Sequence, residues 1–436
     1  MLNVFKRNKI VFIFVFIIIL LTPFSLETRA ETDKVSVVTS VGIDRVKEGV
    51  EVSANVIVPN SGGSGGAGGT DGTVKTVTAT GNNISTAFSN LTLIIGKTPG
   101  LAHCDAIILN KNLFETSVLE YLDFFIRTNN LTSNATLIVA ENTAKEIVET
   151  TASQKGLRAV SLSDVLLLNN EYALTKKANI DAFYLEHFSP SACSVLPLLT
   201  VGDSNKENGE VGNKGAEKIK SSTVPTKTEN ESLGSSSSGG NGEKSGQSGN
   251  GSPTKIIKNE GKGVVVKNGK IIKVVSGAEM SGINLVSKNT KRGHLQIKNI
   301  TAKQFENADL SFKIFNKKTK VNGYFFNGVP VFNYNLDLVL KLEEVNSENF
   351  KVDMLKTTEN YVEGTIKNEI AKKVNFDLAA IINTAKQNKV DILGVHDYFY
   401  KMFNKQWLNF VDSLPDKTDY LNYVIFTVDL KTQGKI

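Results

Sequence analysis

The feature that most constrains this chain is a low-complexity segment, 202–254, which divides it in two. Ser, Gly, Asn, Lys and Glu dominate the segment, and it contains no aromatic residue. Such a composition cannot bury enough apolar surface to offset the entropy of ordering the backbone, so we expect a disordered linker. The sequence therefore predicts two folded halves, 31–201 and 255–436, on a loose tether.

The N-terminus has the pattern of an export signal. Three basic residues precede the apolar run Ile10–Leu21, and a polar stretch ending at Ala30 follows. This order matches the charged, apolar and cleavage regions of a secretory signal. Extending the run to Leu26 brings it near the lower limit of about 17–25 residues for a membrane span. We expect 1–30 to be a cleaved signal peptide or an uncleaved anchor, with the remainder outside the cytoplasm.

The first half alternates strand and helix patterns. Val35–Ile43, Val50–Val58 and Val74–Thr80 are rich in β-branched residues, which predicts a hairpin and a third strand. A Gly-rich flexible loop, 60–73, separates the last two. Further along, helical and strand periods alternate, which is typical of an α/β layer with helices packed on a sheet. The expected helices and strands are 84–95, 106–109, 118–125, 136–140 and 144–149, with a further helix at 163–169.

The second half has the pattern of the α+β class. Asn268-Gly269 between two apolar stretches predicts a hairpin. Val331–Leu342 alternates as a strand, and an apolar stripe from Val362 to Ala385 predicts one long helix or two. Other elements expected are a helix at 279–285 and strands at 294–300, 310–315 and 423–430. The whole chain is thus predicted to combine α/β and α+β regions, with one or two subdomains in an antiparallel second half.

Charge and cysteine content exclude several classes of protein. The formal net charge is +6, and four basic residues against Glu27 place +3 of it in the first thirty residues. The remaining +3 is too little for a basic stripe, so nucleic acid is not an expected partner. Two cysteines and four well-separated histidines rule out a disulfide-dense scaffold and indicate no metal site. A Cys104–Cys193 disulfide is left open.

Catalytic motifs are missing from the sequence. It contains no H-E-x-x-H, G-x-S-x-G, Walker loop or C-x-x-C, so neither an enzyme nor a cofactor is expected. Gly63-x-Gly65-x-x-Gly68 matches a dinucleotide fingerprint only in form, because a strand follows it instead of a helix. We interpret Glu343-Glu344 as solvent-facing or capping carboxylates and His103-Cys104 as an inert pair.

Several segments, taken in order, carry a resemblance that covers nearly the whole chain. They are Val41-Gly42-Ile43-Asp44, Leu119-x-x-Leu122-Asp123-Phe124-Phe125-x-Arg127, Leu137–Ala140 with Ala144–Ile147, Lys267–Lys270, Asp391–Gly394, Tyr400-Lys401 and Trp407. In this order and spacing the chain resembles the Ger(x)C family, the C-subunit lipoproteins of spore germinant receptors. Two departures stand out. No cysteine precedes Cys104, so lipidation at the family's lipobox is chemically impossible. His396 also stands where the family commonly has a small residue.

The resemblance implies a function and partners. It implies a non-enzymatic, extracytoplasmic subunit at the spore inner membrane, acting in nutrient-triggered germination. Its partners would be A- and B-type integral membrane subunits, and any contact with a small nutrient germinant could be indirect. The alternative is a secreted or surface-anchored solute-binding or adhesion module that is unrelated to germination.

The resemblance also singles out three C-terminal residues as a partner-docking or structural motif: Asp391, Gly394 and Trp407. From their residue types we expect Asp391 to cap a helix and Gly394 to adopt a positive φ angle. Trp407 lies among apolar residues, so it could serve in the core or as an anchor for a partner.

Overall fold

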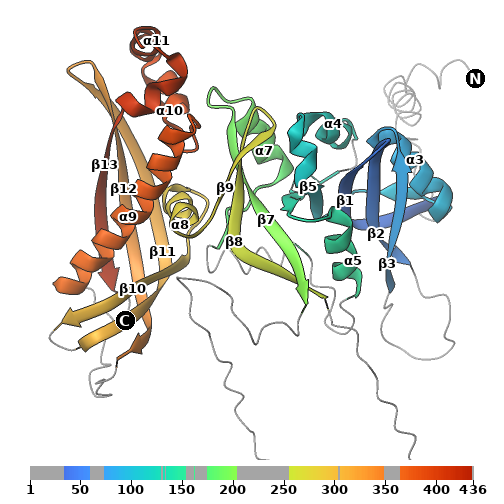
Figure 1. The fold of residues 1–436 in the computed structure, drawn as a ribbon, viewed down its shortest axis with the longest axis horizontal. Helices are drawn as coiled ribbons and strands as arrows, with labels where there is room; N and C mark the ends of the chain where they lie inside the picture. The colour runs from blue at the N-terminus through green and yellow to red at the C-terminus, as the bar shows by residue number, and fades with distance from the viewer. Residues whose placement is uncertain are drawn as a thin grey trace, which may run out of the picture.

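The protein is an elongated assembly of two β-sheets with helices (Figure 1), which confirms the mixed α/β and α+β class. The computed structural model describes residues 34–58, 73–128, 131–132, 134–153, 162, 174–203, 255–302, 305–347 and 364–434. The predicted signal or anchor, nearly all of the Gly-rich loop with its fingerprint-like glycines, the helix at 163–169 and residues 204–254 of the predicted linker lie outside these residues.

The first sheet is mixed and has the order β3-β2-β1-β5-β6-β7-β8-β9, with β4 paired to β1. Its strands are Val35–Val46 (β1), Gly49–Val58 (β2), Thr73–Gly81 (β3), Thr98–Gly100 (β4), Ala106–Asn110 (β5), Thr136–Ala140 (β6), Cys193–Asp203 (β7), Lys255–Lys267 (β8) and Lys270–Val275 (β9). Every residue of β5 and β6 is buried, as expected for parallel strands covered on both faces. The strands predicted in the first half are confirmed.

Helices cover this sheet. They are Ile84–Ile95 (α3), Leu119–Arg127 (α4), Ala144–Ser153 (α5) and Ile180–His187 (α7), with a 3-10 turn at Lys111–Glu115 (η3). Three of them (α3, α4 and α5) lie where the apolar periodicity predicted them, while α7 lies in a stretch for which the sequence predicted no helix. The side chain of Asn83 accepts a hydrogen bond from the Thr86 amide and begins α3, and Gly96, with φ of 71°, ends it.

The second sheet has the order β10-β11-β12-β13. Its strands are Gly293–Ala302 (β10), Phe305–Phe326 (β11), Val329–Asn346 (β12) and Ile425–Gly434 (β13). The helices of this half are Gly277–Val286 (α8), Thr365–Gln387 (α9), Val395–Met402 (α10) and Asn404–Asp412 (α11), followed by a 3-10 turn at Lys417–Tyr423 (η7). The apolar stripe thus forms one long helix, α9, whose buried face contributes to the core of this half.

Two expectations for this half were wrong. First, β13 pairs with β12 in parallel, so the sheet is not purely antiparallel. A parallel partner needs a crossover, and α9 to α11 supply it. Second, the strand predicted at 310–315 extends over all of β11. In its lysine-rich part, exposed Lys318 and Lys320 alternate with residues that face the other side of the sheet, and this part pairs with β12.

Strand pairing continues across the boundary predicted at Lys255. Strands β8 and β9 belong to the first sheet, and β7 pairs antiparallel with β8. Successive residues of these strands point to opposite faces: Val195 and Val265 enter the core of the second half, whereas Leu196 and Val264 enter that of the first. The segment 204–254 therefore connects two neighbouring strands, and the two halves share a seam.

Within the part of the chain that the structure describes, no helix is both long and apolar enough to cross a membrane.

Candidate functional site

The three residues singled out in the sequence meet where α9 gives way to α10. We call the turn 388–394, with α10 and α11, the capped corner. Here Asp391 is buried, and its carboxylate accepts hydrogen bonds from the amides of Val395 (3.0 Å) and His396 (2.6 Å). The hydroxyl of Tyr420 donates a third, at 3.1 Å. Asp391 thereby satisfies the orphan N–H groups of α10 and ties η7 to the helix start.

Burial sets the electrostatics of this corner. It raises the pKa of Asp391, and the amide donors of His396 and Val395 oppose that effect. It also raises the pKa of the Tyr420 hydroxyl, with the charge of Asp391 adding to the effect. The Tyr420 hydroxyl therefore keeps its proton and donates a hydrogen bond to Asp391, and hydrogen-bond donors inside the protein stabilise the charge of the Asp391 carboxylate.

Gly394 provides the backbone turn that precedes α10. Its φ angle is 72°, a region that side chains of L-residues rarely adopt. An added Cβ would find no atom within 4 Å, so the requirement is conformational and not steric. The neighbouring His396 fits the turn, because its amide caps onto Asp391 and its ring Nδ1 accepts from Trp407 Nε1 at 3.3 Å.

Trp407 lies in the core and holds α11 against α10. Its exposed fraction is 0%. Its ring stacks on Phe399 with centroids 5.1 Å apart at 14°, and it meets Tyr420 edge-on at 5.4 Å. A side chain with no exposed surface cannot itself bind a partner. The corner therefore acts as a rigid support, and any docking surface must be formed by its neighbours.

A second buried aspartate performs the same task in the first half, and the sequence analysis did not predict it. At the end of β1, Asp44 accepts from the amides of Ala144 and Lys145, both at 2.8 Å, and from Asn110 Nδ2 at 2.7 Å. It caps α5. A Cβ added at Gly42 would lie 2.9 Å from Val148 Cγ2, so glycine lets α5 approach. The Val41–Asp44 motif was the available signal.

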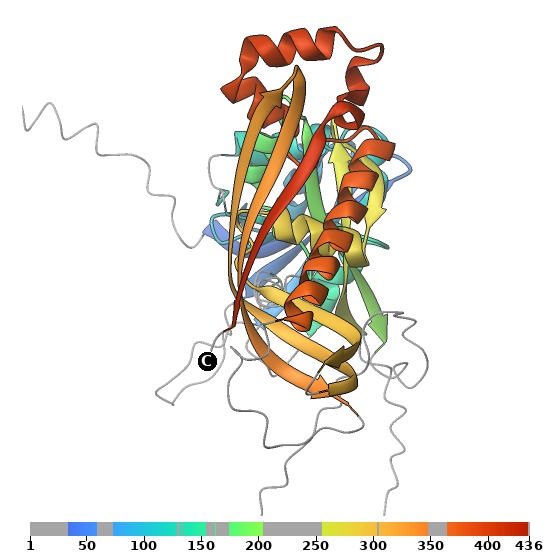
Figure 2. The ribbon, with the colours of Figure 1, turned by 90° about the vertical axis from the view of Figure 1, so that its left-hand side faces the viewer.

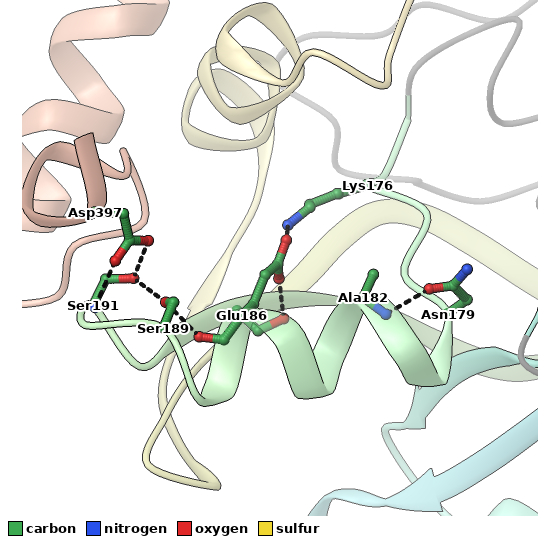
Figure 3. Close-up of polar contacts among 8 residues, drawn as sticks. Lys176, Asn179, Ala182, Glu186, Ser189, Ser191 and Asp397 are labelled. Atoms are coloured by element: carbon green, nitrogen blue, oxygen red, sulfur yellow. Dashed lines mark hydrogen bonds and ion pairs between the residues drawn. The ribbon is translucent and has the colours of Figure 1, made fainter. Parts of the chain in front are cut away.

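A polar network joins the two halves beside the capped corner (Figure 3). The side chain of Asp397 accepts from the amide and the hydroxyl of Ser191, both at 2.9 Å. Ser191 is also 2.9 Å from the Ser189 hydroxyl, which bonds to the end of α7. On the same helix, Glu186 binds Lys176 and Ser194, both at 2.6 Å. These contacts fix α10 relative to α7 and β7.

An apolar patch lies on the outer face of the second sheet, at the turn between β11 and β12. Residues directly opposite each other in a sheet share a face. Phe326 lies opposite Val329. Val331 lies between Tyr324 on one neighbouring strand and Ile425 on the other. The exposed members, Tyr324, Phe326, Val329 and Ile425, define what we call the hairpin patch. Their exposed fractions run from 38% to 61%.

The capped corner supports this patch from behind. Phe325 points the opposite way from its two neighbours, and its ring lies 5.3 Å from Phe399 and 6.0 Å from Phe403. A Cβ at Gly323 would touch Tyr398 at 2.6 Å, which keeps the strand close to α10. Figure 2 shows the hairpin beside α10 and α11 at one end of the sheet. The patch is therefore a rigid apolar surface.

The two cysteines lie in separate cores, and the Glu343-Glu344 pair lies on the surface. Cys104 is buried, which raises the pKa of its thiol to about 12, and its Sγ donates to a backbone carbonyl. Cys104 and Cys193 are free thiols in different cores, so the disulfide left open does not form. Glu343 and Glu344 are exposed on β12. The described residues contain no group of three or more metal-binding side chains.

Most of the chain matches family models for one class of protein. Residues 28–201 match the family model described as "Spore germination protein N-terminal domain", and residues 260–434 match "Spore germination B3/ GerAC like, C-terminal". The chain is therefore a member of the GerAC-like spore germination family, with a role in germination.

A solved structure titled "Crystal Structure of the GerBC protein" is similar to this chain. The two share 16% identity with a TM-score of 0.44, and the alignment covers 91% of this chain and 97% of the other. The comparison with curated proteins produced no match.

Proposed function

We propose that this chain is the extracytoplasmic C-type subunit of a spore germinant receptor. In this role it assembles with A- and B-type integral membrane subunits at the spore inner membrane and performs no catalysis. Membership of the GerAC-like family supports the role in germination. In this role the chain contacts the nutrient germinant only indirectly, through the assembled receptor.

The hairpin patch is the surface that we assign to this assembly. A cluster of aromatic and aliphatic side chains on a rigid support resembles the anchor regions that dominate protein interfaces. The next residues on the same face are polar: Asn333 and Thr427 bond to each other at 2.9 Å, and Asn333 also binds Asp429. The apolar surface is thus confined to the end of the sheet, with a polar rim.

A pair of double variants tests the proposal. Phe326→Ser with Val329→Ser removes the centre of the hairpin patch, where Phe326 is 61% exposed. The matched control is Leu185→Ser with Phe188→Ser, since both of these residues are 76% exposed on and just after α7. Little stability should be lost in either protein, because none of the four replaced side chains belongs to a buried core.

The expected result is selective loss of assembly. Spores with the patch variant should lose copurification of polytopic receptor subunits and nutrient-triggered germination, while the control retains both. If the patch variant copurifies normally, the assigned surface is wrong. If the unaltered chain copurifies with no polytopic subunit, the receptor assignment fails and a secreted or surface-anchored solute-binding or adhesion module takes its place.

A further inference from the structure

The C-terminal end of α3 exposes two adjacent apolar side chains. Leu93 is 80% exposed and Ile94 is 60% exposed, whereas Leu91 of the same helix is fully buried in the core. The helix then ends at Gly96, and exposed Lys97 follows. A single exposed leucine needs no explanation. A leucine and an isoleucine at one helix end, followed by a lysine, form a compact amphipathic tip.

This tip lies beside the point where the described chain begins. Strand β4 follows the helix directly and pairs in parallel with β1, with Val35 opposite Thr98. The contact is close, since a Cβ added at Gly100 would lie 2.6 Å from Val35 Cγ1. Figure 1 shows α3 at the end of the molecule remote from the second sheet. The α3 tip and the first strand therefore share one end of the protein.

The sequence before this strand supplies the second observation. The apolar run that we interpret as a signal or anchor extends from Ile10 to Leu26, and only 27–33 separate it from Lys34. At about 3.3–3.6 Å per extended residue, these seven residues span at most roughly 25 Å. A run held in a bilayer would keep the α3 tip near the lipid surface. The positive charges of Lys34 and Lys97 suit anionic headgroups.

We infer that the α3 tip is a membrane-contact site. Leu93 and Ile94 enter the interfacial layer of a bilayer that contains anionic lipid, and Lys97 lies against the headgroups. An amphipathic element of this kind combines apolar burial with attraction to anionic lipid. The consequence is orientation: the end of the molecule with α3 faces the bilayer. This inference rests on the membrane association in the proposed function.

Site-specific fluorescence tests the contact in the full chain. Ile94→Cys and, as a control, Phe376→Cys each carry an environment-sensitive fluorophore. The control residue is 65% exposed on α9, at the other end of the molecule. Native Cys104 and Cys193 are buried, and burial raises the pKa of both thiols, so they should resist labelling. Each protein is mixed with vesicles of phosphatidylcholine with or without phosphatidylglycerol, and bound protein is recovered by flotation.

The inference predicts a blue shift and quenching by lipid-borne spin labels for the fluorophore at position 94, but not for that at 376. Phosphatidylglycerol should strengthen both effects. Lys97→Ala should lower the ratio of molecules with the α3 tip in the bilayer to molecules with the tip in water. The expected change is about five-fold, which is equivalent to the ~1 kcal/mol that a lysine contributes near an anionic surface. Protein that floats with a water-exposed label at 94 overturns the contact and leaves the proposed function intact. Protein that does not float overturns the contact and the membrane association together.

Discussion

Replacing Trp407 tests directly whether the capped corner is a structural support. Trp407→Ala removes a side chain with no exposed surface, which stacks on Phe399 and fills the space between α10, α11 and η7. Truncating a buried aromatic residue to alanine costs about 3–5 kcal/mol of unfolding free energy. The donor to His396 Nδ1 is also lost, which adds about 1 kcal/mol. The upper part of this range, about 4–5 kcal/mol, is therefore expected.

This loss should be visible as a large fall in Tm. At roughly 2–4 °C per kcal/mol for a unit of 150–250 residues, the fall is about 8–20 °C. Circular dichroism is the suitable probe, because Trp407 is the only tryptophan and its fluorescence disappears with the substitution. Trp407→Phe is the control. It keeps an aromatic ring on Phe399 and should lose clearly less stability than the alanine variant.

The competing interpretation predicts a different pattern. If Trp407 contacted a partner, the alanine variant would keep its Tm and lose receptor assembly. A change in unfolding free energy below about 1 kcal/mol would refute the argument from burial, since surface substitutions rarely exceed this value.

Three further outcomes follow from the structure. Proteolytic cleavage within 204–254 should leave the two fragments together on size-exclusion chromatography under native conditions, because β7 and β8 stay paired; separate elution would disprove the shared seam. Burial lowers the pKa of His396 from 6.5, and the charges of Asp391 and Asp397 oppose this effect. The contribution of the neutral His396 to stability is therefore complete above pH 6.5 and is lost as the pH falls through the folded-state pKa. His396→Gln, which keeps an acceptor for Trp407, should flatten that part of a Tm-against-pH curve, and an unchanged curve would contradict the assignment. Burial also lowers the pKa of Lys317 to about 7. The Lys317 amine therefore binds a proton more tightly in the unfolded chain than in the folded one, and the free energy of unfolding falls as the pH drops from about 10 to 7. Lys317→Met should remove this slope in urea unfolding, and an equal slope in both proteins would count against it.

Lys317 also shows why such a site escapes prediction from sequence. It lies in a lysine-rich stretch that predicts solvent exposure, yet its Nζ donates to the carbonyls of Leu285 at 2.8 Å and Ser287 at 2.6 Å, and to Thr319. Those acceptors come mainly from the end of α8, some thirty residues away. The lysine reaches these acceptors only in the tertiary fold, because they lie far from it in the sequence.

Local patterns in the sequence determined most of the individual elements. The apolar period over 84–95 predicted α3 with its observed bounds, and Asn268-Gly269 predicted a turn in which both residues have positive φ. These features depend on the residues themselves and their near neighbours, through propensity, periodicity and turn chemistry. The family resemblance likewise followed from the order of motifs along the chain.

Tertiary structure alone decided how distant segments combine. The composition of 202–254 separates two halves in sequence, but strand pairing across that segment places β8 and β9 in the first sheet. The parallel position of β13 depends on the path of α9 to α11, and the exposure of Phe326 depends on which face Phe325 takes against Phe399. The residue type of Trp407 suits both a core and an interface. The choice between them was made by the packing of η7 and α10 around it, contacts that no local pattern encodes.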